Sequence, residues 1–410
     1  MPEFFRVITP AQVFEALSSF PRLGTERIRL EDALFRVLAE EIISPENLPV
    51  SSRATMDGYA VRAADTFGAS ESLPAFHSVV GQVNMGMLPK FEVKNGQAAE
   101  IPTGGFLPKG ADAVVMVEYT RPIGHDTIEV VKPVTIGENV LDQGGDVAKG
   151  EVLLLPGRRF RPQDVGLMAG LGLTDVLVFQ RPKVVVVSTG NEIVPIHQCP
   201  SPGQIRDINS YSLSALVRTV GAEPIMYGAI PDDTSLLKES LERGINEGDV
   251  VVVSGGSSVG ERDLMGEVVA RLPNAKILVH GVALSPGKPT LLAKVTGKAL
   301  FGLPGHPVST MIVAQIFLMP FLKFICGEEL ERGPLGSKVK ATLATSIPSA
   351  HGREEYFRVK LEEKNGELYA RPVFGKSSMI STMVKSDGLI VVPIHAEGLA
   401  KGERVNVILF

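Results

Sequence analysis

The stretch VVVSGGSSVGERD, residues 251–263, combines three features that decide the fold of the central part of the chain. Its valines have the composition of a buried strand, and the loop at 254–258 carries almost no side-chain bulk. Two carboxylates, Glu261 and Asp263, follow this loop. Glycine and serine let a ligand reach backbone N–H groups, so the loop is a candidate anion site. The carboxylates would repel an anion unless a metal ion lies between them.

Strand and helix patterns alternate on both sides of this stretch, from residue 184 to residue 325. The continuous apolar run at 184–187 is typical of a strand that is covered on both faces. Further strands are predicted at 224–227, 249–254, 276–279, 290–294 and 299–303. Helices are predicted from Asn209 or Ser210 to about 221, from Asp232 or Asp233, over 263–271, and from about 306 to 325. This order predicts an α/β fold with three layers, α/β/α, around a mostly parallel sheet.

The two flanks have a different composition. Residues 45–150 are rich in glycine and proline and contain short β-like segments, which predicts a β-rich domain. Residues 338–410 contain five segments of alternating hydrophobicity, which predicts a small β-barrel or sandwich. Residues 327–337 are charged and contain glycine, so we expect a linker there.

Composition narrows the class of protein. A length of 410 residues indicates two to four domains, and the net charge of −5 argues against a nucleic-acid-binding protein. Cys199 and Cys326 form no metal or redox motif, so free thiols in a reducing compartment are expected. The first residues do not have the pattern of a signal peptide. The apolar segment 311–326 is interrupted by polar residues and is interpreted as a core helix, so a cytoplasmic protein without a membrane span is expected.

Three glycine-containing loops, at 188–192, 254–258 and 303–307, each follow a predicted strand. Ligands of open α/β sheets bind outside the carboxyl ends of the strands, so these loops point to one crevice. Free backbone N–H groups and a helix N-terminus favour phosphate or another oxyanion there, and Lys288 adds a cation. Glu192, Asp232 and Asp263 also follow predicted strands. Carboxylates together with substrate phosphate are the usual ligands of Mg²⁺.

Simpler interpretations of the same residues exist. A Gly-Gly pair after a strand is often only a tight turn, and Asp232 or Asp233 can be a helix cap. Lys288 can be a surface lysine, and His306 can have a packing role. The sequence contains no G-x-x-x-x-G-K-[ST] loop and no G-x-G-x-x-G after a strand. The common nucleotide-binding classes therefore lose support.

Nine motifs occur in an order that matches one known family. They are ATMDGYAV (54–61), PTGG (102–105), GADAVV (110–115), GENV (137–140), GD (145–146), STGNE (188–192), GQIRDIN (203–209), PGKP (286–289) and LPGHPVS (303–309). With the loop at 254–258, they make the chain resemble the molybdopterin molybdenumtransferases, the MoeA and gephyrin E-domain family, over nearly its whole length.

The resemblance implies four domains in an elongated homodimer. They are a molybdopterin-binding α/β domain (1–22 and 180–327), a linking domain (23–44 and 147–179), an inserted β-rich domain (45–146) and a C-terminal β-barrel (334–410). In this family the inserted domain of one subunit faces the crevice of the other. Asp57, Thr103 and either Asp142 or Asp146 would then complete the partner's active site.

The resemblance also implies a reaction, in which molybdate is inserted into adenylylated molybdopterin with Mg²⁺ and AMP is released. The implied metal ligands are Glu192, Asp232 and Asp263. The implied catalytic residues are Asp57, Thr103, Asp263 and Lys288. The implied substrate-binding residues are Thr189, Gly190, Ser254, Gly255, Gly256, Ser257, Pro304, Gly305, Ser309, Arg353 and Ser378, with Ser377 as the alternative to Ser378. Without the family, Arg353 would be interpreted as a solvated charge.

Three positions depart from the family's pattern. Asn191 stands where Asp is frequent, Ser285 where Lys is frequent and His306 where Asn is common. These departures suggest altered affinity, and a tungstate-preferring insertase is one alternative. A molybdopterin adenylyltransferase, a scaffold and a carrier without turnover are others. The inserted and C-terminal domains argue against the adenylyltransferase, which is expected instead as a partner in the same pathway.

Overall fold

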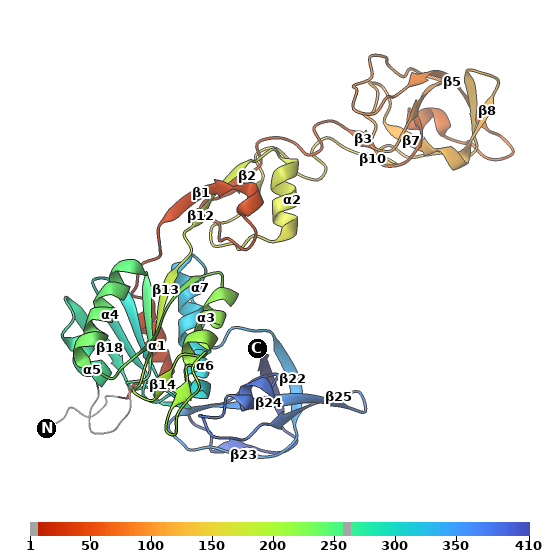
Figure 1. Ribbon diagram of the computed structural model, residues 1–410. Helices are drawn as coiled ribbons and strands as arrows, with labels where there is room; N and C mark the ends of the chain where they lie inside the picture. Colours follow the sequence, from red (N-terminus) through yellow and green to blue (C-terminus); the bar gives the residue numbers. More distant parts are fainter. Residues whose placement is uncertain (1–6, 257–263) are drawn as a thin grey trace.

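The computed structural model describes residues 7–256 and 264–410. The chain is elongated (Figure 1). The α/β domain and the C-terminal barrel form one end, a small linking region lies in the middle, and the inserted β-rich region forms the other end. This arrangement confirms the predicted multidomain α/β architecture, while the domain boundaries given above stay predictions.

The α/β domain is built on a six-stranded sheet with the order β16-β13-β17-β21-β20-β18. The strands are β13 (Lys183–Thr189), β16 (Glu223–Ile230), β17 (Val250–Ser254), β18 (Ala275–His280), β20 (Leu291–Val295) and β21 (Lys298–Leu303). The first four in the order pair in parallel, and the last two are antiparallel additions. The register places Ser188 beside Ser254, and Ser254 beside Leu303. The three glycine loops therefore begin side by side at the carboxyl ends of the neighbouring strands β13, β17 and β21.

Helices cover both faces of this sheet, as predicted (Figure 1). One face packs against α1 (Pro10–Leu17), α3 (Asn209–Thr219), α6 (Pro307–Val313), the π-helical turn η4 (Ala314–Leu318) and α7 (Met319–Ile325). The other packs against α4 (Thr234–Glu247) and α5 (Leu264–Ala270). Within the described residues, one continuous helix, Pro307–Ile325, is long and apolar enough to cross a membrane. It is largely buried in the core, as predicted for residues 311–326.

The linking region has a core of its own. Strand β1 pairs with β12 and β2 with β11, and the turn η1 and helix α2 complete the unit. These elements are β1 (Thr25–Arg29), η1 (Leu30–Asp32), β2 (Ile42–Ile43), β11 (Val152–Leu154), α2 (Pro162–Gly170) and β12 (Asp175–Phe179). Residues from both sides of the inserted region thus build one small core.

The inserted region contains a six-stranded sheet with the order β7-β4-β6-β5-β9-β8. Its strands are β4 (Gly58–Val61), β5 (Ala75–Gln82), β6 (Gln97–Ile101), β7 (Ala113–Met116), β8 (Thr120–Ile123) and β9 (Thr127–Val130). It also has the turns η2 (Ala63–Thr66) and η3 (Val117–Tyr119). A short pair, β3 (Arg53–Ala54) with β10 (Val140–Leu141), leads back toward the linking region (Figure 1).

The C-terminal region is a closed barrel, which decides between the predicted barrel and sandwich. Its strands are β22 (Lys338–Leu343), β24 (Glu354–Lys364), β25 (Glu367–Pro372), β26 (Gly388–Val392) and β28 (Arg404–Leu409), with α8 (Ser381–Val384) before β26. Pairing of β24 with β26 closes the ring. The short strand β19 (Leu284–Ser285) of the α/β domain pairs with the start of β24 and so joins the barrel to the α/β domain. Two further short pairs complete the strands described: β14 (Ile193–Val194) pairs with β15 (Ile205–Arg206), and β23 (Ile347–Pro348) pairs with β27 (Gly398–Leu399) in the barrel region.

Candidate active site

A pocket of about 1360 Å³ opens at the carboxyl ends of β13, β16, β17 and β21. Parts of all three glycine loops line it, together with the start of α6 and one residue of the barrel region. The sequence-predicted site residues that line it are Thr189, Gly190, Glu192, Asp232, Ser254, Gly255, Gly256, Pro304, Gly305, Ser309 and Ser378. The expectation of one crevice at the strand ends therefore agrees with the geometry. Ser257 and Asp263 lie outside the described residues.

Glycine is required where the loops pack against each other. Gly255 has a φ of +104°, and a Cβ atom built there would lie 2.3 Å from the carbonyl oxygen of Thr189. A Cβ on Gly305 would lie 3.6 Å from the Cα of Gly255. The backbones of the three loops are thus in direct contact, and a side chain at 255 would separate the first two.

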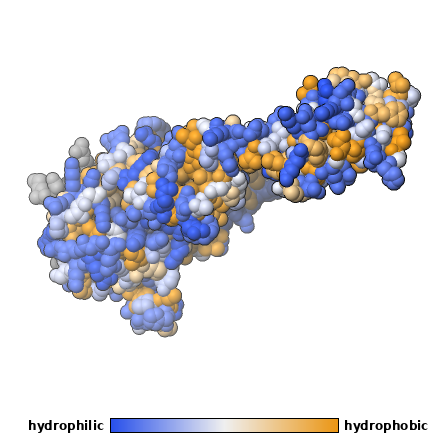
Figure 2. All heavy atoms as spheres, turned by 90° about the horizontal axis from the view of Figure 1, so that it is seen from above, coloured by the Kyte–Doolittle hydropathy of each residue, from blue (hydrophilic) through white to orange (hydrophobic). Residues whose placement is uncertain are grey.

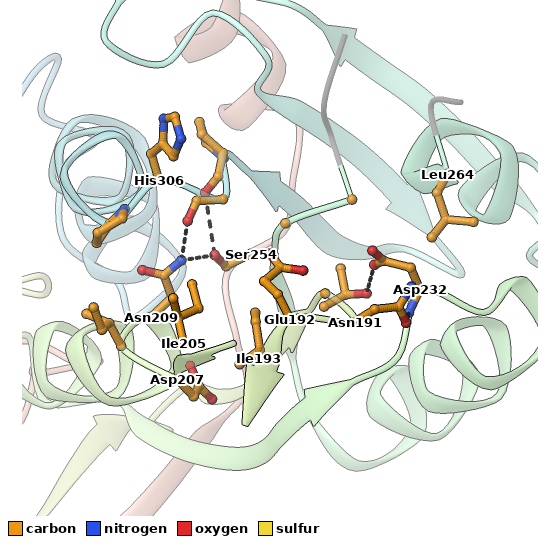
Figure 3. Close-up of a pocket in the computed structure, with 18 of the residues that line it drawn as sticks. Asn191, Glu192, Ile193, Ile205, Asp207, Asn209, Asp232, Ser254, Leu264 and His306 are labelled. Carbon is orange, nitrogen blue, oxygen red and sulfur yellow. Dashed lines mark hydrogen bonds between the residues drawn. The ribbon is translucent and has the colours of Figure 1, made fainter. Parts of the chain in front are cut away.

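Asn209 ties two of these loops together, whereas the sequence indicated only that it could begin a helix. It is the first residue of α3 and is buried. Its Nδ2 donates to Ser254 Oγ at 2.6 Å and to the carbonyl oxygen of Gly305 at 2.8 Å (Figure 3). Its position as the last residue of the GQIRDIN motif was the only signal in the sequence. The separation of 45 residues between Asn209 and Ser254 hid their contact.

The carboxylates lie on the first loop and at the end of β16. Asp232 Oδ1 accepts a hydrogen bond of 2.7 Å from Thr189 Oγ1, and the backbone N–H of Asp232 donates to Asn191 Oδ1 at 3.1 Å. Thr189 therefore orients a carboxylate in this structure. The carboxylate of Glu192 folds back over Gly190, where a Cβ would lie 2.9 Å from Glu192 Oε2.

Two exposed carboxylates in one pocket fit a Mg²⁺ ion, because this ion is usually held by one or two carboxylates with substrate phosphate and water. Among residues 7–256 and 264–410, no group of three or more His, Cys, Asp and Glu side chains is placed to hold a metal. Glu192 and Asp232 would supply two oxygen ligands to such an ion.

The predicted cations Lys288 and Arg353 lie outside the set of described residues that line the pocket. Arg353 Nη2 pairs with Glu355 Oε1 at 2.5 Å. Glu355 is paired with Ser285 across β19 and β24, so Arg353 precedes a strand that runs beside the loop of Lys288. Both cations therefore lie near the contact between the α/β domain and the barrel. Pro289, which follows Lys288 in the chain, lines the pocket.

Asp57 and Thr103 lie in the inserted region, far along the chain's long axis from the pocket of the same subunit (Figure 1). The two residues are in contact, because the backbone N–H of Thr103 donates to Asp57 Oδ1 at 2.6 Å. This hydrogen bond, with one from the Thr103 side chain, lowers the pKa of Asp57. The exposed carboxylate is therefore kept ionised, but one chain alone does not bring it to the pocket.

Comparison with known proteins decides the family. Residues 8–172 match the model of the MoeA N-terminal region (domain I and II), residues 185–323 that of a probable molybdopterin binding domain, and residues 340–410 that of the MoeA C-terminal region (domain IV). The chain belongs to the MoeA family. The resemblance inferred from the motifs is thereby confirmed.

Relatives and structures of the MoeA family match the whole chain. A putative molybdopterin biosynthesis protein of Methanocaldococcus jannaschii is 35% identical, covering 97% of this chain and 96% of its own. The molybdopterin molybdenumtransferase of Bacillus subtilis is 32% identical, covering 98% and 94%. A crystal structure of the molybdopterin biosynthesis MoeA protein of Pyrococcus horikoshii is 35% identical with a TM-score of 0.85, covering 99% of this chain and 100% of that one.

Proposed function

We propose that the protein is a molybdopterin molybdenumtransferase of molybdenum cofactor biosynthesis. In this proposal it takes adenylylated molybdopterin and molybdate, breaks the phosphoanhydride bond in a Mg²⁺-dependent step, and releases AMP and the metal-loaded cofactor. The observation that carries the proposal is the pocket itself, where three glycine loops in backbone contact surround the exposed carboxylates of Glu192 and Asp232. The names of the relatives at about a third identity support the same activity.

The glycine loops bind the substrate in this proposal. Gly256 and Gly305 line the pocket without a side chain, which leaves room for a bulky ligand beside their backbone. Asn209 holds the second and third loops at a fixed spacing through its two hydrogen bonds. Fixed spacing matters because a preorganised site binds and orients a substrate without first reorganising.

The carboxylates of Glu192 and Asp232, with Asp263, would hold Mg²⁺, which supplies positive charge to the diphosphate when bound. Thr189 keeps Asp232 in one orientation through its 2.7 Å hydrogen bond. Lys288 and Arg353 are assigned to the negative charge of phosphate or oxyanion, since guanidinium and ammonium donors match these groups. Ser309 and Ser378 are assigned to the oxyanion, and both line the pocket.

The site is completed across a homodimer in this proposal. Asp57 and Thr103 are exposed and hydrogen-bonded to each other on the inserted region, which lies away from its own subunit's pocket, and this contact keeps the Asp57 carboxylate ionised. Exposed hydrophobic side chains, Met85, Met87 and Leu88, lie on the same region and are more than half accessible. Figure 2 shows hydrophobic patches on this end of the molecule. Such patches are typical of surfaces that bind other proteins. In this proposal the partner is a second copy of the chain, whose own Asp57 does not reach its pocket.

The test is to mix the purified full-length protein with adenylylated molybdopterin and Mg²⁺, add molybdate or tungstate in parallel, and measure AMP release and metal-loaded cofactor. AMP release with metal incorporation is expected, and the oxyanion with the higher kcat/KM identifies the metal used. Tight binding of the pterin without AMP release would refute the transferase and favour a carrier or scaffold. We place the reaction in the cytoplasm and expect the pathway's adenylyltransferase to deliver the substrate.

A further inference from the structure

His306 connects the third glycine loop to the C-terminal barrel. It follows Gly305 and directly precedes α6. Its Nδ1 lies 2.8 Å from Ser377 Oγ, and two residues later the backbone N–H of Val308 donates to the carbonyl oxygen of Ser377 at 3.0 Å. These two hydrogen bonds fix the loop that carries Ser378 against the beginning of the helix. The imidazole is therefore held in one orientation at the rim of the pocket.

The second ring nitrogen is available to a ligand. Throughout residues 7–256 and 264–410, no hydrogen bond to His306 Nε2 occurs, and the side chain is exposed where it lines the pocket. A serine hydroxyl that donates to Nδ1 places the ring proton on Nε2. Ser377 can thus set the tautomer in which Nε2 is a donor that faces open space.

The distribution of charge around the pocket assigns an anion to this side. The described lining residues include three exposed carboxylates, Glu192, Asp232 and Glu267, and one exposed guanidinium, Arg206. Figure 3 shows Asp232 and His306 on opposite sides of the pocket. A dianion is repelled from the carboxylate side and meets donors on the other side. Ser309 and Ser378, which carry hydroxyl groups, also line the pocket.

We propose that His306 binds the tetrahedral oxyanion substrate, molybdate or tungstate, through Nε2–H while Ser377 holds Nδ1. This inference rests on the proposed function and adds a specificity-determining residue to it. An asparagine at the same position could still hydrogen-bond Ser377 through its short amide, but it would end before the position of Nε2. The imidazole therefore gives this chain an oxyanion donor that an asparagine lacks.

Two substitutions separate oxyanion binding from the link to the barrel. His306→Asn keeps a group that can reach Ser377 and removes the distal nitrogen, whereas His306→Gln places an amide nitrogen close to the distal position. We expect His306→Asn to raise the KM for molybdate about tenfold, the size of one hydrogen bond to a charged group. The KM for adenylylated molybdopterin should stay within about twofold, because the hydrogen bond in question is to the oxyanion alone. His306→Gln should recover part of the loss.

A matched control is His125→Asn, an exposed histidine in the hairpin between β8 and β9 that should leave both KM values unchanged. The inference is overturned if His306→Asn behaves as wild type while His306→Gln and Ser377→Ala lose activity, because His306 would then only link the barrel to α6.

Equilibrium dialysis of molybdate against wild type and His306→Asn separates this inference from the proposed function. If wild type binds molybdate more tightly than His306→Asn but releases no AMP, the transferase fails and the oxyanion site stands. If AMP is released and the two proteins share one KM and one affinity for molybdate, the transferase stands and the role of His306 fails. A wild type that neither binds nor incorporates molybdate or tungstate overturns both.

Discussion

Replacing Gly255 by alanine tests whether contact between the glycine loops builds the pocket. An L-residue at a φ of +104° carries a backbone cost of about 1–2 kcal/mol. The new Cβ would also lie 2.3 Å from the carbonyl oxygen of Thr189, which is backbone and can move only with its loop. Relief of such overpacking costs about 1–3 kcal/mol more. The total loss of stability is therefore about 2–5 kcal/mol, the sum of these two ranges.

Gly297→Ala is the matched control, because Gly297 lies in the same domain at a φ of +89° with no atom within 4 Å of the new Cβ. It carries the backbone cost without the clash. Thermal unfolding should show Gly255→Ala melting several degrees below Gly297→Ala, since about 2 kcal/mol corresponds to about 4–8 °C for a domain of this size. AMP release should fall about a hundredfold in Gly255→Ala alone, as expected for a displaced site. Equal melting temperatures with full AMP release by Gly255→Ala would refute the contact between loops.

Three further predictions concern other parts of the chain. Asn209→Ala removes both hydrogen bonds between the second and third loops and should destabilise the domain by about 1–3 kcal/mol and raise the KM for the pterin substrate; an unchanged KM in steady-state kinetics would contradict its role in spacing the loops. His77 is buried in the inserted region, and its ring nitrogens make no hydrogen bond within the described part of the chain; burial lowers its pKa, an effect that Asp65 and the backbone of Ala75 partly oppose. As the pH falls, the unfolded state therefore takes up a proton at a higher pH than the folded state, and the melting temperature should fall below about pH 6.5. His77→Phe should flatten this dependence of melting temperature on pH; an identical dependence in both proteins would show that another group is responsible. Asp57→Ala and Asp232→Ala should each lose AMP release, and subunits mixed by mild dissociation and reassociation should recover part of it; no recovery after confirmed exchange would argue against a shared site.

Much of the α/β domain followed from local sequence. The valine run of β13 is buried on both faces, and this pattern was sufficient to predict a central parallel strand. The N-cap of α4 was also predictable from local sequence. Asp233 directly precedes this helix, and its side chain accepts hydrogen bonds from the backbone N–H groups of Ser235 and Leu236. Such features depend on neighbours within a few residues, and their energies do not require knowledge of the rest of the chain.

The hydrogen bonds that connect the glycine loops could not be predicted from local sequence. Asn209 donates to Ser254 and Gly305, which lie 45 and 96 residues further along the chain. The same holds for His306 and Ser377, which are separated by 71 residues. A side-chain amide or imidazole gives no local pattern that names its partner, so only the register of β13, β17 and β21 decides which loops meet.

By itself, the sequence determined the strand and helix periods, the glycine loops after the strands, the carboxylates beside them and the family, because these are properties of short segments and their order. The tertiary structure decided which of these segments are in contact. It placed Glu192 and Asp232 in one pocket, set Arg353 against Glu355, and put Asp57 in the inserted region, away from that pocket. The physical reason is that hydrogen bonds and charge act over a few ångströms, and only folding converts separation along the chain into such distances.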